Sequence, residues 1–241
     1  MTHTKTFVLV HGSWHGAWCW ARVLPALREE HEAVAVELPA HGSDPAGVEA
    51  ATFERYVDRV GTAVDAAVGE VVLVGHSMGG HVVTQVAERH ADAVAAVVYL
   101  AAFLPGDGQS LTDLDAGAFD SAVPEHIVVD DERGVVTFEG AGADDTFYQD
   151  CSERDAAFAR SRLRPEPAAP RHVPVSLSEQ RYGAVPRVYI ECTEDRALPV
   201  AFQRSMYEAV GCDAVHSLET GHAPFLAAPT AVAETLRGVT E

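Results

Sequence analysis

The sequence has few cysteines and no long apolar run. Its 241 residues include four cysteines, which lie far apart and form no C-x-x-C pair. This usage excludes a disulfide framework or a zinc ribbon and favours a reduced, cytoplasmic setting. The apolar run at residues 7–10 is far too short for a signal peptide or a membrane span, so we expect no targeting signal, anchor or pro-segment.

Positive charge is also scarce. Lys and Arg number 17 against 36 Asp and Glu, which gives a net charge of −19 and a pI near 4.9. A chain this acidic repels phosphate backbones and anionic lipids, so we expect neither nucleic acid nor membrane as a partner. With 47% apolar and 22% charged residues, the composition is that of an ordinary globular protein and excludes disorder or coiled coil as the main architecture.

Motifs that hold cofactors are missing as well. The sequence contains no G-x-G-x-x-G, Walker or H-E-x-x-H pattern. His11 and His15 are four residues apart, but Gly12 and Gly16 argue against a helix that would bring them onto one face. We therefore predict no metal ion and no nucleotide or other cofactor.

What the sequence does contain is a repeated alternation of short apolar strands and amphipathic helices. Strands apolar on both faces and separated by helices indicate a parallel sheet covered by helices. The predicted class is therefore α/β, with a mainly six-stranded parallel sheet. The predicted strands are residues 7–10, 33–37, 71–74, 94–100, 187–192 and 214–218, and the predicted helices are residues 18–30, 52–68, 79–90, 199–210 and 224–239.

The alternation breaks between residues 105 and 185. This stretch is rich in Gly, Asp and Pro, and the prolines of residues 164–170 exclude an uninterrupted helix there. A structureless loop of this length is improbable in a compact domain, so we predict an inserted cap of short helices and a small hairpin. Residues 1–104 and 186–241 then form the core, and residues 105–185 form the cap.

A tight strand–turn–helix motif lies at residues 75–79, Gly-His-Ser-Met-Gly. An apolar strand precedes it and a helical pattern follows, which is the setting of a nucleophile elbow. Gly75 and Gly79 remove side chains that would collide in the turn, and Gly80 lets the helix approach the sheet. Ser77 is therefore the predicted nucleophile, at a helix N-terminus that favours a developing anion.

A serine nucleophile needs a base, which in this arrangement follows an acid in the chain. His222 lies just after the last predicted strand and can reach over the turn, whereas His216 lies inside that strand. The acid should follow the preceding strand, where Asp195 is the choice and Glu194 its near rival. Asp107, after the strand at residues 94–100, is a weaker alternative.

Stabilising an oxyanion requires two backbone N–H donors aimed at one point. One should come from Met78, the residue after the nucleophile. The other should come from the loop after the first strand, at Ser13, where Gly12 allows close approach. The Ser13 side chain is not the expected donor.

These residues resemble the α/β-hydrolase superfamily and, within it, the plant methylesterase and hydroxynitrile lyase group, which includes salicylate-binding methylesterases, together with its bacterial esterase relatives. The resemblance covers nearly the whole chain and weakens between residues 106 and 145. It implies triad roles for Ser77, Asp195 and His222. The stretches that carry it are residues 7–20, 75–80, 101–105, 148–152, 163–165 and 182–203.

The resembled lyases differ from this chain at three positions. They place Thr after the first loop His, Glu before the nucleophile and Lys after the catalytic His; here these residues are Gly12, His76 and Ala223. Without that lysine a cyanide leaving group lacks its cationic stabiliser, so the esterase branch is favoured. The chain also differs from the plant enzymes in a shorter cap and at Met78, His81 and Pro224. The resemblance therefore does not decide the shape of the pocket or the identity of the substrate.

We therefore predict a serine hydrolase that cleaves a small, largely apolar carboxylic ester, with a methyl ester as one candidate. One alternative is a hydroxynitrile lyase-like or other carbon–carbon-cleaving enzyme with the same triad. Another is a ligand-binding or biosynthetic accessory protein with a vestigial triad. A homodimer is left open. The candidate substrate-binding residues are Trp14, His76, Phe103, Phe147, Leu163 and Phe225.

The negative charge is concentrated in the first part of the predicted cap. Residues 105–155 hold 14 acidic and 2 basic residues, whereas residues 156–185 hold 2 acidic and 5 basic ones. So many carboxylates cannot be buried without partners, so we expect this acidic part to face solvent. Cap carboxylates that lined the pocket would contradict this expectation and would indicate a cationic substrate.

Overall fold

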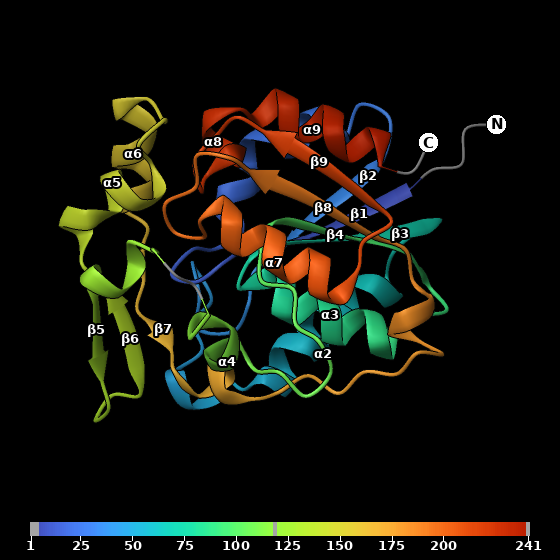
Figure 1. Ribbon diagram of the computed structural model, residues 1–241, viewed down its shortest axis with the longest axis horizontal. Coiled ribbons are helices and arrows are strands. Elements are labelled where there is room, and N and C mark those ends of the chain that lie inside the picture. The colour runs from blue at the N-terminus through green and yellow to red at the C-terminus, as the bar shows by residue number, and fades with distance from the viewer. Residues whose placement is uncertain (1–4, 118–119, 240–241) are drawn as a thin grey trace.

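The computed structural model describes residues 5–117 and 120–239 and has a six-stranded parallel sheet at its centre (Figure 1). The strand order is β2-β1-β3-β4-β8-β9, and every pair is parallel. The predicted fold class is confirmed. The strands are β1 (Lys5–Val10), β2 (Glu32–Val36), β3 (Glu70–Ser77), β4 (Val94–Ala102), β8 (Arg187–Cys192) and β9 (Ala214–Leu218).

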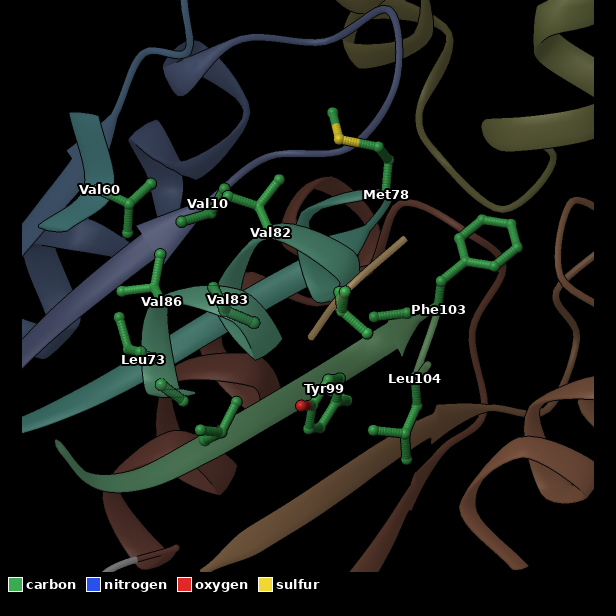
Figure 2. Packing of buried hydrophobic residues seen from close by; sticks show 14 of the residues in the cluster. Val10, Val60, Leu73, Met78, Val82, Val83, Val86, Tyr99, Phe103 and Leu104 are labelled. Carbon is green, nitrogen blue, oxygen red and sulfur yellow. The ribbon is translucent and has the colours of Figure 1, made fainter. Parts of the chain in front are cut away.

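Helices cover both faces of this sheet because alternate strand residues point to opposite sides. One face packs against α2 (Phe53–Asp65), α3 (Gly79–Arg89) and α7 (Val200–Val210). The other packs against α1 (Leu24–Leu27), α8 (Pro224–Ala227) and α9 (Pro229–Gly238). Figure 2 shows the first of these cores, in which valines of α3 pack with Leu73 of β3 and Tyr99 of β4.

Two of the predicted helices are divided. The helix expected at residues 18–30 is a 3₁₀ turn at Ala17–Arg22 followed by the short α1. The helix expected at residues 224–239 breaks at Ala228, which has an extended φ of −139°. Pro229 follows Ala228, and a residue before proline is disfavoured in the helical region because its backbone meets the proline ring.

The edge strand β9 also departs from the expectation of strands that are apolar on both faces. Its residues from Ala214 to Ser217 are exposed, including His216. The strand pairs only with β8 among the described residues, so one of its edges is open. Pairing with β8 rather than burial on both faces holds it in place.

Between β4 and β8 lies the insertion predicted at residues 105–185. Its hairpin of β5 (Ile127–Asp130) and β6 (Val135–Phe138) is antiparallel, as expected, and gains a third strand, β7 (Glu166–Pro167). Figure 1 shows this small sheet at one end of the molecule, beside the short helices. The helices of the insertion are α4 (Leu111–Asp115), α5 (Ala143–Phe147) and α6 (Glu153–Arg160).

Five further short 3₁₀ turns lie in the connections between strands and helices, both in the core and in the insertion, among the residues that the structure describes. They lie at Val48–Ala50, Val123–His126, Gly140–Gly142, Ala169–His172 and Tyr182–Ala184. Within the described ranges no helix has the length and apolar character needed to cross a membrane.

Candidate active site

The predicted nucleophile Ser77 is the last residue of β3 and has a left-handed backbone, with φ of 52°. A Cβ on Gly75 would lie 2.7 Å from backbone atoms of Gly79, and one on Gly79 would lie 2.7 Å from the Val10 carbonyl oxygen. A Cβ on Gly80 would collide with the carbonyl oxygen of Phe103. The three glycines therefore permit the tight turn and the close helix approach that the sequence predicts.

The predicted base and acid are in direct contact. His222 Nδ1 donates a hydrogen bond to Asp195 Oδ2 at 2.7 Å, and both residues are buried. Asp195 Oδ1 accepts the backbone N–H groups of Ala197 and Leu198, each at 2.8 Å. These bonds fix the carboxylate, which in turn selects the His222 tautomer with its proton on Nδ1 and leaves Nε2 as an acceptor.

The rival residues do not make this contact. Glu194 is exposed, and His216 lies exposed on the edge strand. Asp107 accepts the backbone N–H of Leu177 at 2.8 Å and so helps to hold the insertion.

Two backbone N–H groups near Ser77 have no backbone or side-chain acceptor among the described residues: that of Ser13 in the loop after β1, and that of Met78 in the turn after β3. Gly12 packs against the turn so closely that a Cβ on it would lie 2.6 Å from Ser77 Cβ. Trp14, the next residue after Ser13, has a left-handed backbone with φ of 60°, and its carbonyl accepts the N–H of Arg164 in the insertion.

Two buried histidines hold this loop. His11 Nδ1 donates to the Gly12 carbonyl at 2.9 Å, and His15 Nδ1 donates to the Ser13 carbonyl at 2.7 Å. Because the peptide is planar and trans, fixing the Gly12 carbonyl also fixes the opposite direction of the Ser13 N–H. Tyr148 donates to His15 Nε2 at 2.9 Å. Burial lowers the pKa of His15 to about 4, so its ring is neutral at pH 7.

His76 packs against His222 and Phe225 packs against His76, and neither is among the residues that line the cavity, although both are predicted as substrate-binding residues. His76 Nε2 donates to the His222 carbonyl at 2.8 Å, and the two rings lie 4.7 Å apart. Phe225 meets the His76 ring edge to face at 4.9 Å. Burial lowers the pKa of His76 well below its ordinary value, which keeps this support uncharged.

A cavity of about 110 Å³ opens beside the nucleophile, and Ser13, Ser77 and His222 all lie in its wall. Much of the remaining wall is apolar, and it includes the predicted Trp14, Phe103 and Phe147. The predicted Leu163 instead lies in a separate hollow. The apolar wall residues are Trp14, Phe103, Val123, Pro124, Ile127, Phe147, Ala197 and Leu198.

The cavity also has a charged part, which the sequence does not predict. Asp115 and Arg171 both line it, so the expectation that the acidic insertion faces only solvent is wrong at Asp115. The physical reason is pairing: Arg171 binds Asp115 and also binds Glu166 at 3.0 Å. Asp115 and Arg171 are 56 residues apart in a segment without a sustained helical or strand pattern. The sequence therefore does not indicate that the two side chains meet.

Hydrogen bonds from the insertion also hold the two loops that carry Asp195 and His222. Gln149 Nε2 donates to the Glu194 carbonyl at 2.8 Å, and Asp150 Oδ2 accepts the Gly221 N–H at 2.7 Å. Sequence reasoning missed these two residues as positioning groups. The resemblance at residues 148–152 was the signal that could have found them.

Within the described residues no group of three or more His, Cys, Asp or Glu side chains is arranged to hold a metal ion. The predicted residues that the structure brings into direct hydrogen-bond contact are His222 and Asp195.

The chain is similar in sequence and fold to several known proteins. A sequence profile described as "Alpha/beta hydrolase family" matches residues 7–235. The chain is 31% identical to polyneuridine aldehyde esterase of Rauvolfia serpentina over 98% of this chain and 96% of that protein. It is 30% identical to salicylic acid-binding protein 2 of Nicotiana tabacum over 98% and 97%. A crystal structure of a pyrethroid hydrolase from Sphingobium faniae JZ-2 superposes with a TM-score of 0.86 at 25% identity, covering 98% of this chain and 97% of that one.

Proposed function

The chain belongs to the alpha/beta hydrolase family, and from that premise we propose that it is a serine hydrolase of small, largely apolar carboxylic esters. The observation that carries the proposal is the 2.7 Å hydrogen bond from His222 to Asp195, beside a cavity that Ser77 also lines. Its esterase relatives support the same reaction class.

In the proposed reaction, Ser77 Oγ attacks the ester carbonyl carbon while His222 Nε2 takes its proton. The carbonyl oxygen becomes an oxyanion, which the N–H groups of Ser13 and Met78 stabilise, each by about 10²–10³ in rate. Asp195 orients the imidazole and stabilises the imidazolium. His222 then protonates the leaving alcohol, and the acyl group stays on Ser77. Water, deprotonated by His222, attacks this acyl-enzyme and releases the acid.

The cavity wall supports a small ester. Its volume of about 110 Å³ is below the ~300 Å³ at which sites for drug-sized ligands begin. Aromatic and aliphatic side chains make up most of the wall, so an apolar acid is favoured. A methyl ester, whose alcohol adds little volume, is the substrate that we would test first.

The lyase alternative is weaker because the cavity offers no uncommitted cation. Ala223, at the position of the lysine in the resembled lyases, is buried. Arg171 is the one Lys or Arg among the lining residues that the structure describes, and it is paired with two carboxylates. A cyanide leaving group would therefore find no free positive charge there.

The test is hydrolysis of a panel of methyl, p-nitrophenyl, lactone and thioester substrates by the wild type and by Ser77→Ala. We expect Ser77→Ala to lose esterase activity and labelling by a fluorophosphonate probe. Ser121→Ala is the matched control, because Ser121 lines the same cavity but donates its hydroxyl to the Ala197 carbonyl at 2.7 Å. Undiminished hydrolysis of every ester by Ser77→Ala would refute the proposal. Cyanide release from an aromatic cyanohydrin, lost in His222→Ala, would support the lyase instead.

A further inference from the structure

The charged part of the cavity is built on anchored elements. Asp115 ends α4, whose first turn is capped by Ser110, and Arg171 lies in the 3₁₀ turn Ala169–His172. Thr112 of α4 donates its hydroxyl to the Arg171 carbonyl at 3.1 Å, which ties the two elements together. Arg171 then bridges the carboxylates of Asp115 and Glu166. Side chains fixed in this way can discriminate between ligands.

The three side chains differ in how far they are exposed. The Glu166 side chain is 2% exposed and the Arg171 side chain 14%, whereas that of Asp115 is 37% exposed. Both terminal nitrogens of Arg171 are occupied by carboxylates. Asp115 binds Arg171 through Oδ2 only, and its Oδ1 has no hydrogen-bond partner among the described residues. Because Asp115 lines the cavity, this oxygen is an acceptor that a ligand there could use.

The local charge favours a donor over an anion. Two carboxylates, Asp115 in the cavity wall and the buried Glu166, bind one guanidinium, which leaves this cluster of three side chains with a net charge of about −1. The nearby His41 and His81 do not offset it, because burial lowers the pKa of both rings and keeps them neutral at pH 7. Burial raises the pKa of Asp115, whereas the neighbouring Arg171 guanidinium lowers it.

We propose that this site selects esters that carry a hydrogen-bond donor, a hydroxyl or an ammonium, remote from the ester group, and that Asp115 Oδ1 accepts the donor. The inference rests on the proposed function, because it concerns the same cavity. It predicts that an ester ended by a carboxylate is rejected, since that group would meet the Asp115 carboxylate in the cavity wall. The apolar wall would hold the chain between the two polar ends.

The experiment compares p-nitrophenyl esters of matched acids that end in a methyl, hydroxyl, ammonium or carboxylate group, over a series of chain lengths. The readout is the ratio of kcat/KM for each polar ester to that of the methyl-ended ester of equal length. Because each ratio is taken within one protein preparation, it does not depend on how much of a variant is folded. Activity on the methyl-ended esters reports on the proposed function by itself.

Asp115→Asn keeps the size of the side chain and removes its charge. Asp120→Asn is the matched control: Asp120 is exposed, lies outside the cavity wall, and has a φ of 62°, which asparagine tolerates. We expect the wild type and Asp120→Asn to favour the hydroxyl or the ammonium ester at the best chain length. In Asp115→Asn that preference should fall by about tenfold, the difference between a charge-assisted and a neutral hydrogen bond. The relative rate on the carboxylate ester should rise.

Two results would overturn the inference. In the first, the wild type hydrolyses the methyl-ended esters at least as well as both donor-ended esters at every length, which leaves the esterase function intact. In the second, a donor preference exists but is the same in Asp115→Asn and Asp120→Asn. Absence of Ser77-dependent hydrolysis for every ester would refute the proposed function itself and remove the basis of this inference.

Discussion

Replacing Gly12 by alanine should block the proposed oxyanion site without unfolding the protein. The added Cβ would lie 2.6 Å from Ser77 Cβ, 3.0 Å from His76 Nδ1 and 3.2 Å from Ser77 Oγ, whereas ordinary contacts lie at 3.4–4 Å. Either the loop or the nucleophile must therefore shift by about 1 Å, and a displacement of that size costs about 10²-fold in rate when it misplaces reacting groups. Loss of the Ser13 donor would cost about 10²–10³.

We therefore expect Gly12→Ala to lower kcat by about 10²–10³, or ~2.7–4 kcal/mol of transition-state stabilisation. The assay is steady-state hydrolysis of a p-nitrophenyl ester, with the thermal unfolding temperature and circular dichroism as checks on the fold. Gly238→Ala is the control, because Gly238 lies in α9 and an added Cβ meets nothing within 4 Å. A folded Gly12→Ala protein with the kcat of the wild type would refute the reasoning.

Three further predictions concern the buried histidines. His76→Leu should lower kcat because the His222 carbonyl loses its hydrogen-bond donor. His76→Gln keeps an N–H donor and should retain more activity. Steady-state kinetics of the two variants tests this difference. His15→Leu should likewise lower kcat with little change in KM, and His15→Asn should rescue part of it by donating to the Ser13 carbonyl. Burial lowers the pKa of His81 to about 4, so the unfolded chain binds a proton that the folded chain does not, and stability falls as the pH drops from 6.5 toward 4. His81→Phe should reduce that acid-induced loss by ~2–3 kcal/mol, measured by urea unfolding near pH 7.5 and near pH 4.5.

Local sequence rules are sufficient to predict the six strands of the sheet and the tight turn at Ser77. The strand that leads to Ser77 contains a continuous apolar run at residues 71–74, and the strand before Asp195 contains a shorter one at residues 188–190. The glycines around the serine have a steric role that any strand-to-helix turn of this tightness requires. The pairing of Asp195 with His222 followed from chain order, because both follow neighbouring parallel strands and so reach the same edge of the sheet. The catalytic roles of these residues are what the substitutions above test.

The cavity wall could not be predicted in the same way. Leu163 is a predicted substrate-binding residue, yet it lies in a separate hollow. Asp115 and Arg171 are 56 residues apart and come from a short helix and a 3₁₀ turn, neither of which has a periodic pattern. Their contact depends on how the insertion folds over the core. No local rule relates two such residues, so the charge of the wall became visible only in the structure.

The steric contact at Gly12 also bears on the lyase alternative. The resembled lyases have threonine at this position, and even a Cβ there collides with Ser77 in this chain. Accommodating threonine would require a different spacing between the loop after β1 and the turn after β3. His11, His15 and His76 hold that spacing through hydrogen bonds to backbone carbonyls, and burial keeps all three rings neutral. Gly12→Thr alone should therefore abolish ester hydrolysis without creating cyanohydrin cleavage, measured on both substrate types, because the hydrogen bonds that set the loop spacing would be unchanged.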